Sequence, residues 1–153
     1  MRSRLATLVV SVLCGWSCTK NEPVNIEATH PKFSAGQVWS YRTRPGEEKS
    51  RLTVLRIDKK EPQGFIVHIR LDDVSMKNPS APNGIARTIG HLPFALASID
   101  ASVITLERTG AVPDFGDGYR MWRDAFDQNK AGVWTTSVAD AVNAMETGLS
   151  KNQ

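Results

Sequence analysis

Three runs of alternating apolar and polar residues occupy the middle of the chain, at positions 38–44, 51–59 and 65–71. A period of two residues is typical of β-strands, because successive side chains of a strand point to opposite faces. Pro45-Gly46 suits the centre of a type II turn, and residues 61–64 form a second turn signal. We therefore predict a three-stranded antiparallel meander. Its expected core face holds Trp39, Tyr41, Thr43, Thr53, Leu55, Ile57, Phe65, Val67, Ile69 and Leu71.

The alternation stops after this meander. Residues 78–91 contain two prolines and two glycines and predict a loop. Pro93 then predicts the start of a short helix reaching Asp100, because the missing N–H of proline is not needed in a first helical turn. The β-branched stretch 103–106 predicts a fourth strand or, as the alternative, an extension of that helix.

Helical spacing returns near the C-terminus. Tyr119, Trp122 and Phe126 form one aromatic stripe, which is typical of a helix face packed on a core. Ser137 and Asp140 resemble a capping box at the start of a last helix. Strands first and helices later predict an α+β fold, an antiparallel β-meander of three to four strands packed by two to three C-terminal helices over one sheet face.

The N-terminus has the layout of a secretory signal. Arg2 and Arg4 precede an uncharged, largely apolar stretch at 5–13, and small Ser17 stands just before Cys18. The apolar stretch is shorter than the ~20 residues that a membrane-spanning helix needs. We therefore predict an exported protein whose signal ends at residue 17.

Two kinds of processing fit this segment. It resembles a bacterial lipobox, which would make Cys18 the lipid-bearing N-terminus, although Trp16 is bulky and Gly15 replaces the usual leucine-like residue. Plain secretion, the alternative, would leave Cys18 as a lone thiol in an oxidising compartment, since Cys14 departs with the signal. We favour lipid attachment at Cys18, and Thr19 after it indicates the outer membrane in a Gram-negative host.

Domain boundaries and charge follow from this reading. We expect a signal peptide at 1–17, a flexible tether at 18–35, because this stretch is polar and without a period, and a single α+β domain at 36–150. The full chain has a formal charge of +3, but removal of the signal with its two arginines leaves 17 basic against 16 acidic side chains. A nearly neutral mature protein gives no electrostatic reason to expect nucleic acid as a partner.

Three short motifs resemble those of a group of small bacterial exported proteins. They are Gly-Gln-Val-Trp-Ser-Tyr-Arg-Thr-Arg-Pro-Gly-Glu at 36–47, Gly-His-Leu-Pro at 90–93 and Ala-Gly-Val-Trp-Thr at 131–135. The resemblance covers about residues 36–149. No activity, fold or ligand is established for the group, so the resemblance implies no site.

Candidate catalytic residues are few. The chain lacks the motifs G-x-S-x-G, H-E-x-x-H, G-x-G-x-x-G and the P-loop, and its three histidines are not spaced as metal ligands, so we predict no metal or cofactor site. His91 ends the glycine-rich loop and is the candidate centre of a small periplasmic hydrolase, with Asp114 or Asp117 as its carboxylate partner. Residues 114–118 predict a turn ahead of a helix and match neither a kinase nor a calcium-binding loop.

The strand pattern also predicts a basic outward face on the meander, made of Arg42, Arg44, Arg56, His68 and Arg70. An ordinary solvated surface balanced by nearby acids is the alternative, and it is the expected state of an uncovered sheet face. We favour a lipid-anchored, non-catalytic envelope protein that binds another macromolecule, as an inhibitor or immunity protein would, or an assembly factor. We favour the solvated surface for the basic face itself, and if this face instead contacts the partner, that partner is acidic. The rival interpretation is the hydrolase with its site near His91.

Overall fold

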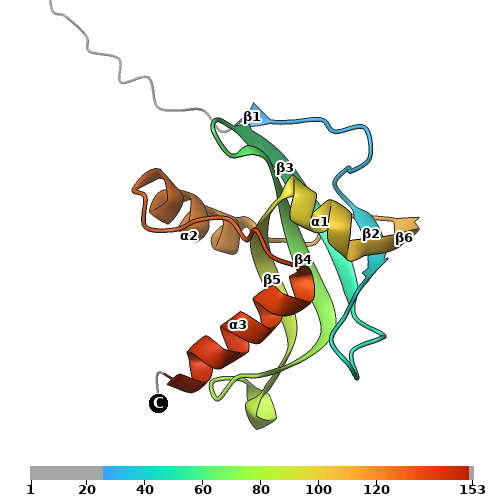
Figure 1. Ribbon diagram of the computed structural model, residues 1–153, viewed down its shortest axis with the longest axis vertical. Coiled ribbons are helices and arrows are strands. Elements are labelled where there is room, and N and C mark those ends of the chain that lie inside the picture. Colours follow the sequence, from blue (N-terminus) through green and yellow to red (C-terminus); the bar gives the residue numbers. More distant parts are fainter. Residues whose placement is uncertain (1–25, 152–153) are drawn as a thin grey trace, which may run out of the picture.

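The computed structural model describes residues 26–151, which form one antiparallel six-stranded sheet and three α-helices (Figure 1). Along the main path the strand order is β5-β4-β3-β2-β6, and β1 pairs with β3 beside β2. This confirms the predicted α+β fold with an antiparallel meander packed by helices. The strands are β1 (Ile26–Glu27), β2 (Gln37–Tyr41), β3 (Arg51–Lys60), β4 (Gly64–Lys77), β5 (Ile85–Ala95) and β6 (Val103–Thr109). The helices are α1 (Leu96–Ser102), α2 (Gly116–Asp127) and α3 (Val138–Lys151), with a short 3-10 turn at Pro82–Gly84.

Both predicted hairpin turns are present. The N–H of Glu47 donates to the carbonyl of Arg44 at 3.1 Å, and Gly46 has φ +82°, as the second central residue of a type II turn requires. The second turn joins β3 to β4 tightly enough that Lys60 pairs with Gly64. Sequential strands therefore lie side by side from β2 to β5, and β6 adds to the free edge of β2.

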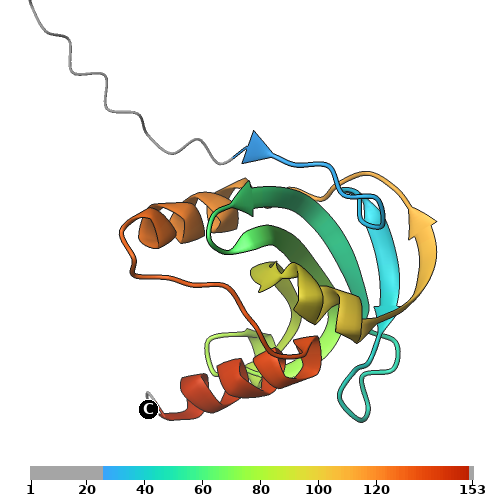
Figure 2. The ribbon, with the colours of Figure 1, turned by 45° about the horizontal axis from the view of Figure 1, so that its top comes forward.

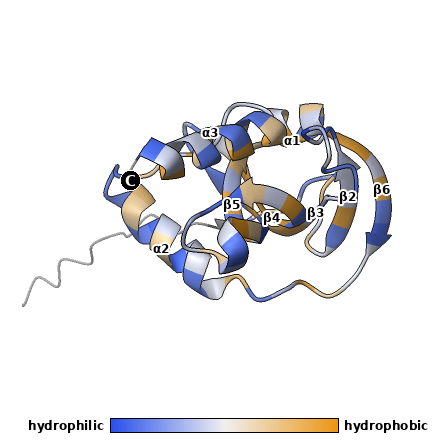
Figure 3. Cartoon of the chain, turned by 90° about the horizontal axis from the view of Figure 1, so that it is seen from below, coloured by the Kyte–Doolittle hydropathy of each residue, from blue (hydrophilic) through white to orange (hydrophobic). Residues whose placement is uncertain are grey.

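The sheet is strongly curved, and helices lie on both of its faces (Figures 2 and 3). Helices α1 and α3 cover the concave face, where Val67 and Ile69 of β4 contribute to the main core. Helix α2 lies against the opposite face, where Ile66, Trp122 and Phe126 form a second, smaller core. The expectation that helices would cover one face only is therefore wrong. Successive residues of β4 point to opposite faces of the sheet, and those on both faces are buried.

A β-bulge in β3 changes the predicted facing of its side chains. Val54 is registered with Ile69 and Arg56 with His68, so Leu55 is an extra residue without a partner on β4. An extra residue reverses the in-and-out alternation that follows it. Thr53 and Leu55 therefore do not continue the core row of Ile57 as predicted, and the main core instead takes Leu52, Val54 and Ile57 from β3.

The segment around Pro93 is a strand, which corrects the predicted loop at 78–91 and the helix starting at Pro93. Residues 85–95 form β5, an edge strand on β4, and the helix begins only at Leu96. Proline is tolerated on an edge, since its missing N–H removes no bond to the neighbouring strand. The outer edge is also covered in part, because Trp134 donates to the carbonyl of Pro93 and accepts from the N–H of Ala95, each at 2.9 Å. The strand predicted at 103–106 is confirmed as β6.

The folded domain begins earlier than predicted. Residues 26–27 pair with Asp58 and Lys59 of β3, and Phe33 is 1% exposed within the main core against Trp39. Residues 26–35 therefore belong to the domain and not to a tether. The remainder of the predicted tether, the signal and Cys18 lie outside the described residues. Within residues 26–151, no helix is long and apolar enough to span a membrane.

Candidate functional site

A line of polar side chains runs beneath helix α2, on the sheet face that the sequence predicted to be exposed. Asp58 and His68 are both completely buried there. Asp58 accepts hydrogen bonds from Arg56 Nε at 2.6 Å and from the hydroxyl of Tyr119 at 2.7 Å. His68 Nε2 lies 3.3 Å from Asp58 Oδ2, off the line of a hydrogen bond, and it has no hydrogen-bond partner in the described part of the chain. The buried carboxylate of Asp58 is thus stabilised by two hydrogen-bond donors and lies beside the ring of His68.

His91 extends this line toward the surface. Its Nε2 lies 2.9 Å from Nδ1 of His68, and the two rings are stacked 15° from parallel. A second bulge places it there. Ile69 is registered with Leu92 and Leu71 with Ile89, so that Gly90 and His91 of β5 both stand opposite the single residue Arg70. Bulges redirect side chains in this way, and here the bulge brings His91 onto the face of His68.

The surroundings keep both histidines neutral near pH 7. Burial lowers the pKa of His68, and the nearby carboxylate of Asp58 opposes this only in part. Burial and the neighbouring ring of His68 lower the pKa of His91 to about 4. Burial would raise the pKa of Asp58, but its contacts with His68, Tyr119 and Arg56 lower it, so this group is a carboxylate. The line therefore contains one negative charge, balanced by the guanidinium of Arg56.

Helix α2 closes over the line with aromatic side chains. Trp122 and Tyr119 meet the ring of His68 edge-on, with centroids 4.8 and 5.0 Å away. Gly118 allows the helix to approach, because a Cβ built at this position would lie only 2.9 Å from Cβ of His91. A Cβ built at Gly118 would also lie 3.7 Å from His91 Nδ1, so this side of the ring lies close to the first turn of α2. The aromatic stripe predicted from the sequence is thus the lid of a polar cluster.

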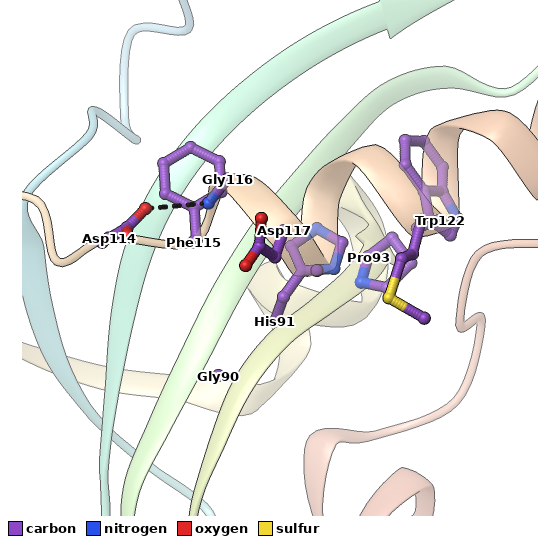
Figure 4. A pocket seen from close by; sticks show the side chains of 10 residues that line it. Gly90, His91, Pro93, Asp114, Phe115, Gly116, Asp117 and Trp122 are labelled. Carbon is purple, nitrogen blue, oxygen red and sulfur yellow. Dashed lines mark hydrogen bonds between the residues drawn. The ribbon is translucent and has the colours of Figure 1, made fainter.

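An open cavity of about 570 Å³ lies where this line reaches the surface, between β5 and the start of α2 (Figure 4). His91 and Asp117 lie between the rings of Phe115 and Trp122. The exposed side chain of Met121 also lines the cavity. Asp114 Oδ1 accepts a hydrogen bond from the N–H of Gly116 at 3.0 Å. The ten lining residues include two carboxylates and a histidine, but no serine, threonine, cysteine, lysine or arginine. His91, Asp114 and Asp117, which the hydrolase interpretation combined in one site, all line this cavity.

The five residues of the predicted basic face do not share an exposed surface. Three of them, Arg56, His68 and Arg70, do lie on one sheet face, but His68 is buried and both arginines are paired with aspartates on their own strands. Arg44 is 13% exposed and joins Glu47 to Glu146 of α3, on the other side of the sheet. Arg42 is exposed and donates to the carbonyl of Ala101. A partner-binding role for these five residues stays a prediction, but Arg44, Arg56 and His68 are engaged in contacts within the chain.

Asp58 and Tyr119 are the residues of the site that sequence reasoning missed. Asp58 was expected to balance charge on a wet surface, and Tyr119 to be plain core. The sequence did contain an indication of this site. By strand alternation Arg56, Asp58 and His68 fall on one sheet face, and the amphipathic α2 needs a sheet face to pack on. Within residues 26–151, no group of three or more histidines, cysteines or acidic residues is arranged to hold a metal ion.

Comparisons with known proteins give the site no precedent. No family model, curated protein or solved structure matches this chain. The resemblance to small bacterial exported proteins therefore stays a prediction, and the functional argument rests on the cavity and the polar line behind it.

Proposed function

We propose that the protein is a non-catalytic binding module of the bacterial cell envelope, anchored by lipid at Cys18, and that it binds its macromolecular partner at the cavity beside His91. The observation that carries this proposal is the composition of the cavity. Phe115, Trp122 and Met121 offer apolar contact, and His91 and Asp117 offer a few placed acceptors. Apolar walls with a few fixed polar groups are typical of binding pockets.

The cavity replaces the basic face as the candidate contact surface. Three arginines of that face, Arg44, Arg56 and Arg70, already have acidic partners within the chain, so using them for an external partner would leave buried or half-buried carboxylates unpaired. The cavity lining, in contrast, includes Met121 with 74% of its surface exposed, together with half-buried Phe115. An exposed apolar side chain at the mouth of a pocket is a natural anchor for a partner.

Capture of partners from an envelope extract tests the proposal. Tagged full-length protein is compared with Met121→Lys, which replaces the apolar anchor by a positive charge at the cavity, and with Ile104→Lys, a matched change at a residue 61% exposed on β6. Strand β6 lies at the opposite edge of the sheet from β5. We expect Met121→Lys to lose a specific partner that wild type and Ile104→Lys retain, with circular dichroism unchanged. Equal capture by all three proteins would refute binding at the cavity.

Hydrolysis near His91 is the second candidate, and the buried line from Asp58 through His68 favours it. A neutral histidine can act as a general base, and His91 is in hydrogen-bond contact with His68, whose ring lies beside the carboxylate of Asp58. The lining offers no serine, threonine, cysteine or lysine as a nucleophile, so in this candidate His91 activates a water molecule directly. Purified protein is assayed against esters, amides and phosphate esters beside His91→Gln. Turnover lost in that variant would establish this candidate, and absence of turnover in wild type would remove it for these substrates.

A further inference from the structure

The polar line beneath α2 determines what kind of group the cavity receives. Asp58 is fully buried and ionised, so its oxygens accept hydrogen bonds and cannot donate them. His68 Nε2 faces this carboxylate at 3.3 Å. A bare nitrogen lone pair there would face a negative oxygen, and a proton on Nε2 removes that repulsion. We therefore infer that neutral His68 carries its proton on Nε2 and leaves Nδ1 as an acceptor.

The proton of His91 follows from that of His68. His68 Nδ1 and His91 Nε2 are 2.9 Å apart, so one must donate to the other. Because His68 Nδ1 is the acceptor, His91 Nε2 is the donor, and Nδ1 of neutral His91 is left without a proton. This nitrogen has no hydrogen-bond partner in the described part of the chain, it is not fully buried, and His91 lines the cavity. The cavity therefore presents a hydrogen-bond acceptor held in place from within the core.

The charged groups that line the cavity are, like the neutral ring of His91, hydrogen-bond acceptors. Asp114 and Asp117 are carboxylates, and the indole N–H of Trp122 is already used, since it donates to the carbonyl of Gly132 at 2.9 Å. Phe115 and Trp122 add aromatic surface on which a cation can stack. Guanidinium and ammonium groups are donors only, and they carry the charge that these groups attract.

Two positively charged features near the cavity, the start of α2 and Arg120, oppose the binding of a cation. Both are weaker than the attraction by the two carboxylates. The start of α2 contributes about half a positive charge, against the two full negative charges of Asp114 and Asp117. Arg120 pairs with Asp117, but the two side chains are 72% and 91% exposed, so the pair is easily exchanged for another cation.

On this basis, and resting on the proposed function, we propose that the cavity binds a basic side chain, arginine or lysine, of the partner protein, with His91 Nδ1 as a fixed acceptor for its N–H group. This reverses the acidic partner that contact through the basic face would imply.

Nuclear magnetic resonance of full-length protein in detergent, labelled with ¹⁵N at histidine only, tests both steps. The chain has three histidines, so each ring is assigned from the variants His30→Gln and His91→Gln. We expect the free protein to show His91 with a protonated Nε2 and a bare Nδ1. A proton on Nδ1 would overturn the inference before any ligand is added.

Three capped amino acids then probe the cavity: acetyl-arginine amide, acetyl-norleucine amide and acetyl-glutamate amide. We expect the arginine probe to move the His91 signals most, and the glutamate probe not to move them. Asp117→Asn should raise the dissociation constant of the arginine probe roughly fivefold, as loss of one charge contact does. The matched change Asp124→Asn, at an exposed residue of α2 outside the lining, should leave it unchanged.

A stronger response to the glutamate or norleucine probe, or no response to any probe, would overturn the assignment of a basic ligand. Failure of the proposed function is distinguishable from this. If the arginine probe binds as expected while Met121→Lys captures the same proteins as wild type, the cavity recognises basic groups but is not where the macromolecular partner docks.

Discussion

His68 and His91 lie on neighbouring strands without being cross-strand partners. His68 is registered with Pro93, and His91 reaches its ring from the bulge two residues earlier in β5, with Nδ1 and Nε2 2.9 Å apart. The contact couples the protonation of a fully buried ring to that of a ring at a surface cavity. Trp122 packs edge-on against His68, so helix α2 rests on this pair of rings.

Stability should therefore fall as the pH drops from about 6.5 to about 4. The pKa of both histidines is lowered in the folded chain, that of His91 to about 4, so the unfolded chain binds protons first as the pH falls below 6.5. The stabilising contribution of the neutral histidines is fully present above pH 6.5 and is lost by about pH 4. Below that, protonation of Asp58, whose pKa is lowered, adds a further loss. Denaturant unfolding at pH 7.5, 5.5 and 4.5 measures this, and His91→Gln should flatten the slope. An equal slope in that variant would contradict the coupling.

Tyr119→Phe should destabilise the domain by about 1.5–3 kcal/mol, because it removes the 2.7 Å hydrogen bond to the buried carboxylate of Asp58. Hydrogen exchange should increase first in α2, which this bond fastens to the sheet. Arg120→Ala is the control on the same helix. Its pair with Asp117 is exposed, so the free energy of unfolding should change by less than about 0.5 kcal/mol. Equal effects of the two variants would mean that Asp58 does not hold the helix.

Gly118→Ala and Gly148→Ala should have opposite effects, although both replace glycine inside a helix. Alanine favours a helix by about 0.8–1 kcal/mol over glycine, and the space around Gly148 is open, so Gly148→Ala should be stabilising. At Gly118 the added Cβ would meet Cβ of His91 at 2.9 Å, which forces α2 away from β5. We expect this variant to be destabilised and to lose binding at the cavity. Thermal melts of the two proteins decide the matter, and a stabilised Gly118→Ala would show that the helix does not rest on His91.

Trp39→Ala should cost on the order of 3–5 kcal/mol and unfold much of the population, since Trp39 is 8% exposed and packs against Phe33 in the main core. Arg42→Ala, three residues along the chain, changes an exposed side chain and should cost little. Denaturant melts of both variants measure the difference. Similar midpoints would contradict the assignment of Trp39 to the core.

Lipid attachment predicts that the mature protein partitions into the detergent phase after membrane extraction. Cys18→Ser should move it to the soluble fraction or block processing, because the thiol is the site of attachment. Phase partitioning followed by mass spectrometry of the N-terminus provides the measurement. Membrane association that persists in the variant would remove the anchor from the proposed function while leaving the cavity untouched.

Local patterns in the sequence determined the fold class. Alternation at 38–44 and 65–71, the Pro45-Gly46 turn and the aromatic spacing on α2 are each readable without tertiary contacts, because they express strand, turn and helix geometry over a few residues. His91, Asp114 and Asp117 were found for the same reason, as polar residues in segments that connect predicted elements.

Only the tertiary structure decided which faces are covered and how the site is assembled. The extra residues at Leu55 and at Gly90-His91 shift the alternation through pairing with β4, and Gly90 indicates a bulge only once residues 85–95 are known to form a strand. Likewise, Pro93 is a helix start by local rules and becomes part of β5 because an edge strand tolerates its missing N–H. His68 appears solvated from strand parity alone, and it is buried because α2, some fifty residues later, packs on that face. Its contacts span long stretches of chain, so they arise from packing that no local pattern encodes.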